Sequence, residues 1–256
     1  MNSNQVNANR HGKGSLDRII EGLIGLARPS VTDMSHIRSL EAGWERCVRC
    51  GQPVGAGEAT TSGCGSCRGA PGILDGVITL GPFEGLLAEG IRALKYQARG
   101  ELADVLGMHL ALAAEKQFQK GFDSEHWIAV AMPMPFWRKI DRRVDHASLI
   151  AHSLARRLGI KVIQPLKKGP GLPQAGLSRT NRERASHGDI WIRRRGFGGF
   201  ARRLPCFKGK SVLLVDDVLT TGRSMMVAGG ALRQLEPVSV HAAVLAVSTN
   251  RNLEHI

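Results

Sequence analysis

The sequence SVLLVDDVLTTGRS, residues 211–224, gives the strongest indication of how this chain folds. Its apolar residues 212–215 predict a short buried strand, and two carboxylates, Asp216 and Asp217, follow at the C-terminal end of that strand. A turn rich in hydroxyl groups then leads into an apolar helical pattern over residues 225–235. A strand, a tight turn and a helix in this order direct backbone N–H groups and a helix N-terminus toward one point, which favours a bound phosphate.

The turn and the two carboxylates suit different parts of one ligand. Gly222 lets the backbone approach a phosphate closely, and the hydroxyls of Thr220, Thr221 and Ser224 can donate further hydrogen bonds. The adjacent carboxylates would repel a phosphate, but they accept hydrogen bonds from sugar hydroxyls. The pattern therefore predicts a phosphorylated ribose as ligand. The alternative is a doubly wound sheet in which one turn is rich in Asp and Thr without binding anything.

This stretch resembles the 5-phosphoribosyl-1-pyrophosphate (PRPP) signature of type I phosphoribosyltransferases. In that family two acidic residues bind the ribose 2′ and 3′ hydroxyls, and the loop containing TTG binds the 5′-phosphate. The resemblance implies an α/β fold with a parallel sheet flanked by helices, and magnesium bound together with PRPP. Asp217 is the candidate for any acid–base role. The implied PRPP-binding residues are Asp216, Asp217, Thr220, Thr221, Gly222 and Ser224.

A segment stiffened by proline follows the strand predicted over residues 127–132. In type I phosphoribosyltransferases a loop in this place holds pyrophosphate. The corresponding loop here contains Pro133 and Pro135, which exclude a helix, and Arg138 and Lys139, which are its candidate cations. Ordinary surface charges are the alternative interpretation of the two cations.

Three other positions have alternative roles. Lys95 and Tyr96 end a helix predicted over residues 84–97. There they either reach the cleft of the predicted pyrophosphate loop, or Lys95 complements the helix dipole and Tyr96 covers the core. His146 stands beside Asp145, the predicted N-cap of a later helix, and we expect it to be a solvated residue of the helix start; a general base is the alternative.

Four of the five cysteines are paired as Cys47-x-x-Cys50 and Cys64-x-x-Cys67, with glycines beside them. Each pair turns two thiolates toward one point, and two pairs complete a closed tetrahedral site, which indicates structural zinc. A dithiol redox pair and an iron–sulfur cluster are the alternatives. We expect the distant Cys206 to take no part.

The cysteine pairs ahead of the PRPP-like signature make the chain similar to the ComF family of competence-associated, phosphoribosyltransferase-like proteins. Residues 143–147 align with the RGFNQ box of that family but keep only its arginine. The resemblance implies a role in DNA uptake or DNA processing, with the DNA-uptake machinery as a partner. The other matching residues are Leu94, Lys95 and Tyr96 of the LKY box, residues 132–135 of the VPVP box, and Gln174, Leu177 and Arg182 of the Q…L…R segment.

The positive charge of the chain is concentrated in one segment. From Arg138 to Lys210 there are 19 Lys or Arg and 4 Asp or Glu, whereas the rest of the chain has 16 and 18. Such a field attracts pyrophosphate, nucleotides or a nucleic-acid backbone. Aromatic residues alternate with arginines over residues 191–203, which suits single-stranded DNA; a basic turn with buried phenylalanines is the alternative. The candidate nucleic-acid contacts are Arg193, Arg194, Arg195, Arg202 and Arg203.

We expect three parts: a polar tail and amphipathic helix over residues 1–43, a zinc ribbon over 44–72 and a phosphoribosyltransferase-like domain over 73–256. No apolar run approaches the length of a membrane span, and the cysteine pairs favour metal over disulfides, so we expect a cytoplasmic protein. Its expected partners are PRPP, single-stranded DNA and a second copy of the chain. Three interpretations stay open: an active phosphoribosyltransferase of nucleotide or base metabolism, a DNA-handling factor and a non-catalytic PRPP sensor.

Overall fold

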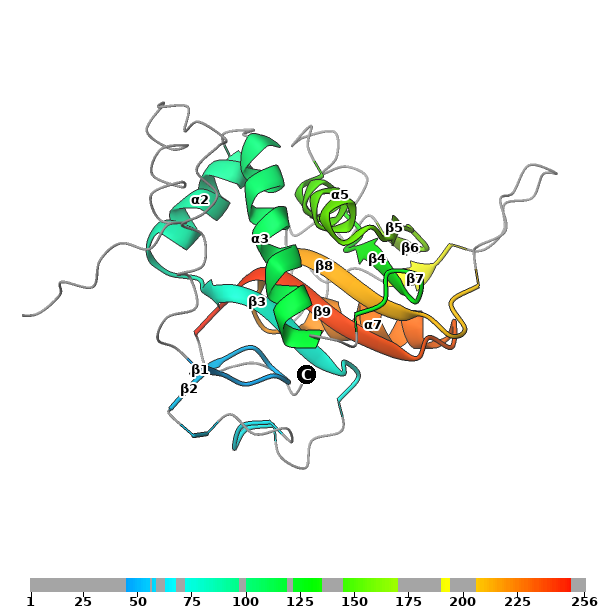
Figure 1. Ribbon diagram of the computed structural model, residues 1–256, viewed down its shortest axis with the longest axis horizontal. Helices are drawn as coiled ribbons and strands as arrows, with labels where there is room; N and C mark the ends of the chain where they lie inside the picture. Colours follow the sequence, from blue (N-terminus) through cyan, green and yellow to red (C-terminus); the bar gives the residue numbers. More distant parts are fainter. Residues whose placement is uncertain are drawn as a thin grey trace, which may run out of the picture. The chain divides into compact units, whose positions relative to one another are not determined.

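A parallel sheet of five strands forms the centre of the described part of the chain (Figure 1). The computed structural model describes residues 45–55, 57–58, 63–67, 72–96, 100–118, 122–134, 145–169, 190–193 and 206–249. The chain divides into two units, residues 1–43 and 44–256, and the predicted tail and amphipathic helix of the first lie outside the described residues. The strands of the sheet lie in the order β3 (Gly76–Pro82), β9 (Ser239–Val247), β8 (Ser211–Leu219), β4 (Trp127–Ala131) and β5 (Lys161–Val162).

The two central strands are apolar on both faces because helices cover the sheet from both sides. Residues 212–215 of β8 and residues 242–247 of β9 are completely buried. Continuous apolar runs of this kind are typical of parallel sheets, in which neither face meets water. The sequence pattern of residues 212–215 therefore correctly predicted a buried strand.

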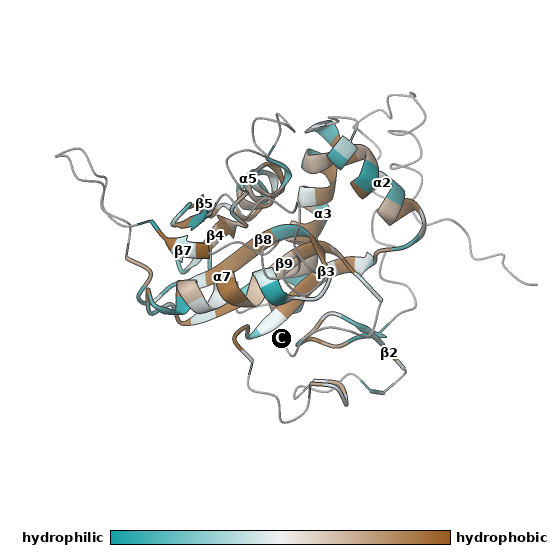
Figure 2. Ribbon diagram, turned by 180° about the vertical axis from the view of Figure 1, so that it is seen from behind, coloured by the Kyte–Doolittle hydropathy of each residue, from teal (hydrophilic) through white to brown (hydrophobic). Residues whose placement is uncertain are grey.

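Helices α3 (Gly100–Phe118) and α5 (His146–Leu158) cover one face of the sheet, and α7 (Arg223–Arg233) covers the other (Figures 1 and 2). A fourth helix, α2 (Gly85–Tyr96), packs beside α3. In the part of the chain that the structure describes, none of the helices combines the length and apolarity needed to cross a membrane.

Gly107 allows α3 and α5 to approach closely. A Cβ atom at this position would lie 2.7 Å from the Cβ of Ser153 and 2.9 Å from the backbone oxygen of Ile150. Beside it, the Ser153 hydroxyl donates a hydrogen bond of 2.8 Å to the backbone oxygen of Asp104. The two helices therefore pack through backbone and small side chains, which fixes α5 over β4 and β8.

The helices predicted over residues 84–97, after Asp145 and over residues 225–235 are present with small changes at their ends. Asp145 caps α5 by accepting a hydrogen bond from the backbone N–H of Ser148 at 3.2 Å. The strand predicted over residues 212–215 is present but longer than expected, because β9 keeps pairing with it as far as Leu219. Residues 161–168 contain two separate strands, β5 and β6 (Leu166–Lys168), of which only β5 pairs with β4.

The segment with the cysteine pairs contains a small antiparallel pair, β1 (Glu45–Arg46) and β2 (Pro53–Val54). Several hydrogen bonds connect it with the large sheet, among them one from the Arg46 guanidinium to the backbone oxygen of Thr79 in β3. The Val77 N–H at the start of β3 donates to the backbone oxygen of Val48 at 2.9 Å, and the Gln52 side chain donates to the backbone oxygen of Ser248 at 2.7 Å. This segment thus contacts β3 on the edge that does not face β9.

A second small pair, β6 (Leu166–Lys168) and β7 (Ile190–Ile192), is antiparallel and contacts α7. The strand predicted over residues 190–192 is confirmed. This pair brings Lys167 and Trp191 opposite each other.

Candidate functional site

The two carboxylates of the signature lie within β8, beyond the point where β4 ends. The last β4 residue, Ala131, pairs with Val215, and the Met132 N–H donates to the backbone oxygen of Val215 at 2.8 Å. On the other side, β9 continues to pair with β8 as far as Leu219. Within the described residues, the edge of β8 that carries Asp216 and Asp217 therefore has no strand beside it on the β4 side. The backbone that follows β4 leaves the sheet at this same place.

The carboxylates are close to each other and to two lysines. The Asp217 N–H donates to Asp216 Oδ1 at 2.9 Å, and Lys95 Nζ, at the end of α2, lies 2.9 Å from Asp217 Oδ1. Burial of the Asp216 carboxyl and the nearby charge of Asp217 raise its pKa to about 7. The charges of Lys95 and Lys168 act in the opposite direction. Lys95 of α2 is thus in direct contact with the acidic pair, and the charge of Lys168 of β6 acts on it as well.

The turn after β8 has the geometry of an anion site. Gly222 has φ of 81°, in the left-handed region that glycine adopts without strain, and it stands at the start of α7. It supplies no side-chain cap, and the first helical hydrogen bond runs from the Met226 N–H to the Gly222 oxygen at 2.8 Å. Thr220 and Thr221 are exposed at this turn. The backbone N–H groups at a helix start are donors that a bound anion satisfies.

The start of this turn is tied to β9. The Ser248 N–H donates to the backbone oxygen of Leu219 at 2.8 Å, and the Ser248 oxygen accepts from the Gln52 side chain. A chain of two hydrogen bonds thus connects the cysteine-bearing segment with the residue that precedes the turn. Sequence reasoning missed Gln52, because nothing in the sequence indicates a contact across almost two hundred residues.

The structure brings together most of the predicted ribose- and phosphate-binding residues. Asp216, Asp217 and the hydroxyl-rich turn meet at the C-terminal edge of the sheet, and Pro133 follows the adjacent strand β4. The rest of the predicted pyrophosphate loop, Pro135, Arg138 and Lys139, lies outside the described residues. The same holds for Arg194, Arg195, Arg202 and Arg203, whereas Arg193 is described and exposed.

The structure decides between the alternatives for Lys95 and overturns one expectation. Lys95 reaches the acidic pair, whereas Tyr96 is 73% exposed and does not cover the core. His146 is only 2% exposed, so the expectation of a solvated residue was wrong. The reason is tertiary: α5 packs against its neighbour α3 and against β4 and β8 of the sheet, and its first residue is buried in this packing.

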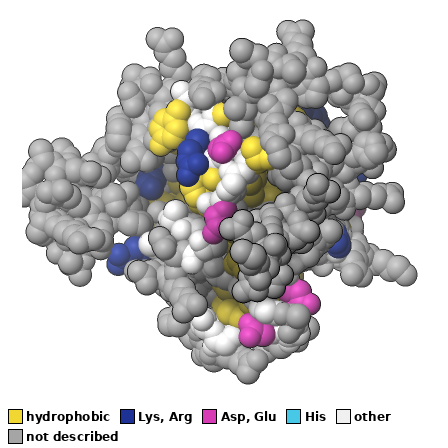
Figure 3. Space-filling view, turned by 90° about the vertical axis from the view of Figure 1, so that its left-hand side faces the viewer, with side chains coloured by type: hydrophobic (Ala, Val, Ile, Leu, Met, Phe, Trp, Pro, Cys, Tyr) yellow, Lys and Arg dark blue, Asp and Glu magenta, His cyan; other side chains and the backbone are white. Residues whose placement is uncertain are grey.

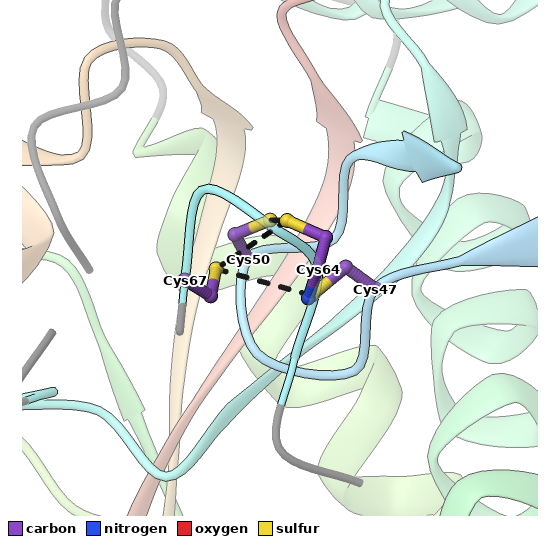
Figure 4. Close-up of side chains that lie close together, drawn as sticks. All are labelled: Cys47, Cys50, Cys64 and Cys67. Atoms are coloured by element: carbon purple, nitrogen blue, oxygen red, sulfur yellow. Dashed lines mark hydrogen bonds between the residues drawn. The ribbon is translucent and has the colours of Figure 1, made fainter. Parts of the chain in front are cut away.

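The four paired cysteines converge on one point (Figure 4). Their Sγ atoms all lie within 4.8 Å of one another, and three of the separations are 3.9, 3.8 and 3.7 Å. A tetrahedral metal site with metal–sulfur bonds of about 2.3 Å requires sulfur–sulfur distances of about 3.8 Å. The cluster can therefore hold a metal ion. Cys206 is exposed and lies outside it.

Burial makes two thiols of this cluster, Cys50 and Cys67, poor acids without a cation between them. Burial raises the pKa of Cys67 to about 11 and raises that of Cys50 further. Burial also acts to raise the pKa of Cys47, but backbone N–H groups, among them that of Cys64, outweigh it and lower the pKa to about 7. The Cys64 N–H donates to Cys47 Sγ at 3.1 Å. A metal cation supplies the charge that would let all four sulfurs ionise together.

The comparisons with known proteins agree with this fold assignment. Residues 146–255 match the family model described as "Phosphoribosyl transferase domain", a stretch that begins with α5 and includes the signature. The chain has the predicted fold, a phosphoribosyltransferase-like α/β fold with a parallel sheet flanked by helices and a four-cysteine cluster ahead of it. None of the curated proteins matches the chain.

Two solved structures are similar to the chain at low sequence identity. One is a purine phosphoribosyltransferase from Pyrococcus horikoshii, at 16% identity and a TM-score of 0.32, over 54% of this chain and 69% of the other. The second is the protein TT1426 from Thermus thermophilus, at 19% identity and a TM-score of 0.34, over 57% of this chain and 81% of the other.

Proposed function

We propose that the chain binds PRPP at the C-terminal edge of its sheet. The observation that carries this proposal is that one strand–turn–helix unit presents two different binding groups, a pair of carboxylates and a turn at a helix N-terminus. The acidic pair of β8 stands at an edge that no described strand covers, and the turn at Gly222 leads into the N-terminus of α7, where Gly222 supplies no side-chain cap. A ligand that contains both sugar hydroxyls and a phosphate can donate to the carboxylates and accept from the helix start at the same time.

Each part of PRPP has a partner in this arrangement. Asp216 and Asp217 accept hydrogen bonds from the ribose hydroxyls, and the turn from Thr220 to Ser224 binds the 5′-phosphate. The pyrophosphate, with magnesium as its counter-ion, belongs on the side of β4, where Pro133 begins the predicted pyrophosphate loop with Arg138 and Lys139. Phosphoribosyl transfer depends mainly on this positioning and on neutralised pyrophosphate. Asp217 stays the candidate for any acid–base step.

Calorimetric titration of the protein with PRPP in the presence of magnesium tests the proposal. Replacing Thr221 by Ala should weaken binding about tenfold or more, because a hydrogen bond to a charged group contributes roughly 1.5–3 kcal/mol. Asp217→Asn should weaken it to a similar degree. Ser239→Ala, at the opposite end of the same pair of strands, is the matched control and should bind normally. Unchanged affinity in both site variants would mean that the signature is architectural only.

Turnover is a separate question from binding. Pyrophosphate release from PRPP, measured with and without bases, amines or DNA, distinguishes a phosphoribosyltransferase from a non-catalytic PRPP sensor. Release that depends on one class of acceptor would identify the enzyme and its substrate. Binding without release under any of these conditions would favour the sensor.

We assign the four-cysteine cluster to structural zinc. The sulfur–sulfur separations fit a tetrahedral site, and all four positions are occupied by thiolates, which leaves no open position for a substrate. Its place in the fold supports a structural role, because this segment is hydrogen-bonded to the edge of β3 and to the end of β9.

A second candidate function is binding of single-stranded DNA, and the pair β6–β7 favours it. Trp191 is 43% exposed and lies opposite Lys167, which is exposed as well, and Arg193 follows on the same strand pair. An exposed aromatic ring beside cations suits a base stacked over a neutralised backbone. Together with the resemblance to the ComF family, this supports a role in DNA uptake or processing.

The DNA-binding proposal is tested by the affinity of single-stranded oligonucleotides at increasing salt. If phosphates are the main target, log affinity should fall with log salt by about 0.7 per phosphate neutralised. Trp191→Ala should weaken binding roughly fivefold or more, since stacking contributes about 1–3 kcal/mol per base. Val238→Ala, which also removes an exposed apolar side chain, is the control. Absence of binding at low salt would contradict the proposal.

A further inference from the structure

Lys95 occupies an unusual place for a lysine at the end of a helix. Its ammonium group does not extend into solvent but lies 2.9 Å from Asp217 Oδ1, and the two side chains are only 20% and 18% exposed. The preceding residue, Leu94, is completely buried, which fixes the last turn of α2 against the fold. The ion pair therefore has a defined position at the acidic pair. Figure 3 shows, on one face of the molecule, basic and acidic side chains side by side among apolar ones.

Two lysines, and not one, act on the acidic pair. Lys95 contacts Asp217 directly, and the charges of both Lys95 and Lys168 favour ionisation of Asp216. The two lysines come from α2 and β6, elements far apart in the sequence. Partial burial of an ion pair costs desolvation free energy. This cost is compensated only while each charge has a partner of opposite sign, either the original one or a replacement. A second anion that enters the site offers Lys95 such an exchange.

The covalent structure of PRPP places an anion at this point. Its pyrophosphate is attached to C1 of the ribose, next to the C2 hydroxyl. If Asp216 and Asp217 accept the 2′ and 3′ hydroxyls, as proposed above, the pyrophosphate lies beside the same carboxylates. An ammonium group within hydrogen-bonding distance of Asp217 is then also close to the pyrophosphate oxygens.

From this geometry we propose that Lys95 is a specificity-determining residue that makes the site prefer PRPP over ribose 5-phosphate. In the free protein Lys95 pairs with Asp217. When PRPP enters, the ammonium group moves to the pyrophosphate and leaves Asp217 to accept the ribose hydroxyls. Ribose 5-phosphate provides no anion at C1, so its hydroxyls must compete with Lys95 for the carboxylate.

This inference rests on the proposed PRPP function, and two ligands test it separately. Calorimetry should compare PRPP with ribose 5-phosphate at the same magnesium concentration, for the wild type and for Lys95→Met. The variant should bind PRPP about ten- to a hundredfold more weakly, because it loses a charge-assisted hydrogen bond to the pyrophosphate. Its affinity for ribose 5-phosphate should change by about threefold or less. The preference for PRPP should therefore fall by about tenfold or more.

Two further variants complete the experiment. Lys208→Met removes an equal charge from an exposed turn at the opposite end of β8 and should leave the preference unchanged. Lys95→Arg keeps the charge and should retain most of the preference. Equal weakening of both ligands in Lys95→Met would overturn the inference, because a purely structural ion pair would support both ligands alike.

The pH dependence of binding gives an independent readout. Without Lys95 the acidic pair loses a counter-charge, so it should take up a proton at higher pH than in the wild type. The affinity of Lys95→Met for ribose 5-phosphate should then fall at a higher pH than that of the wild type as the solution is acidified from pH 8.5 to pH 6. Superimposable profiles would also overturn the inference. A wild type that binds neither ligand would instead contradict the proposed function itself.

Discussion

Replacing Asp216 by Asn should stabilise the protein at alkaline pH while it weakens PRPP binding. Burial and the neighbouring Asp217 raise the pKa of Asp216 from 3.8 to about 7. The folded state therefore binds a proton that the unfolded state has already released between these two pH values. The resulting stability is fully present below pH 3.8 and is lost as the pH rises through 7. Asparagine keeps the acceptor for the Asp217 N–H but carries no charge.

The size of the effect follows from the pKa difference. At about 1.4 kcal/mol per pKa unit, the ionised carboxyl destabilises the folded state by at most about 4 kcal/mol. Between pH 5.5 and 8.5 the gap in free energy of unfolding between Asp216→Asn and the wild type should widen by about 2 kcal/mol in favour of the variant. This would be a site whose function costs stability, as is common for charged binding sites.

Urea denaturation followed by circular dichroism, at several pH values between 5.5 and 8.5 and at constant metal content, measures this gap. Glu89→Gln removes an exposed carboxylate from α2 and is the matched control; its gap to the wild type should not change with pH. A gap for Asp216→Asn that is independent of pH would refute the reasoning. So would a variant that is less stable than the wild type at pH 8.5.

Three shorter predictions concern the metal cluster and the packing. Cys64→Ser should abolish stoichiometric zinc by elemental analysis, and zinc retained in full would exclude the four-thiolate site. Gln52→Ala should keep the zinc but lower the free energy of unfolding by about 1 kcal/mol in urea titration, since it removes the bond to Ser248; no loss would mean that water replaces it. Gly107→Ala should lower the free energy of unfolding by about 1–3 kcal/mol, because α3 and α5 must move apart to make room for the Cβ atom. A wild-type free energy of unfolding would show that the helices move apart without cost.

Several parts of the fold could be predicted from the sequence because they depend on local pattern. The apolar run of residues 212–215 indicated a strand covered on both faces, and the structure confirms it. Asp145 was recognisable as an N-cap because an aspartate before a helical pattern satisfies a free N–H in the first turn. The cysteine pairs indicated one cluster because each CxxC pair turns two sulfurs in one direction.

The signature also determined the order in which the candidate binding groups follow one another along the chain. Acids, hydroxyls and a left-handed glycine follow one another within residues 216–224, so their spacing alone restricts them to one strand, one turn and one helix start. A local motif of this kind specifies its own backbone, and its ligand class follows from the donors and acceptors that it presents.

Tertiary structure alone decided what surrounds that motif. The length of β8 depends on its neighbours: β9 pairs with it through Leu219 while β4 stops at Ala131, and this difference creates the uncovered edge. The enclosure of His146 and the contact between Lys95 and Asp217 likewise depend on how separate helices pack against the sheet. Hydrophobic pattern determines which face of an element is buried, but it carries no information on which distant residue lies opposite. That choice is made by the packing of the whole fold, where burial strengthens the interaction between charges that the chain brings together.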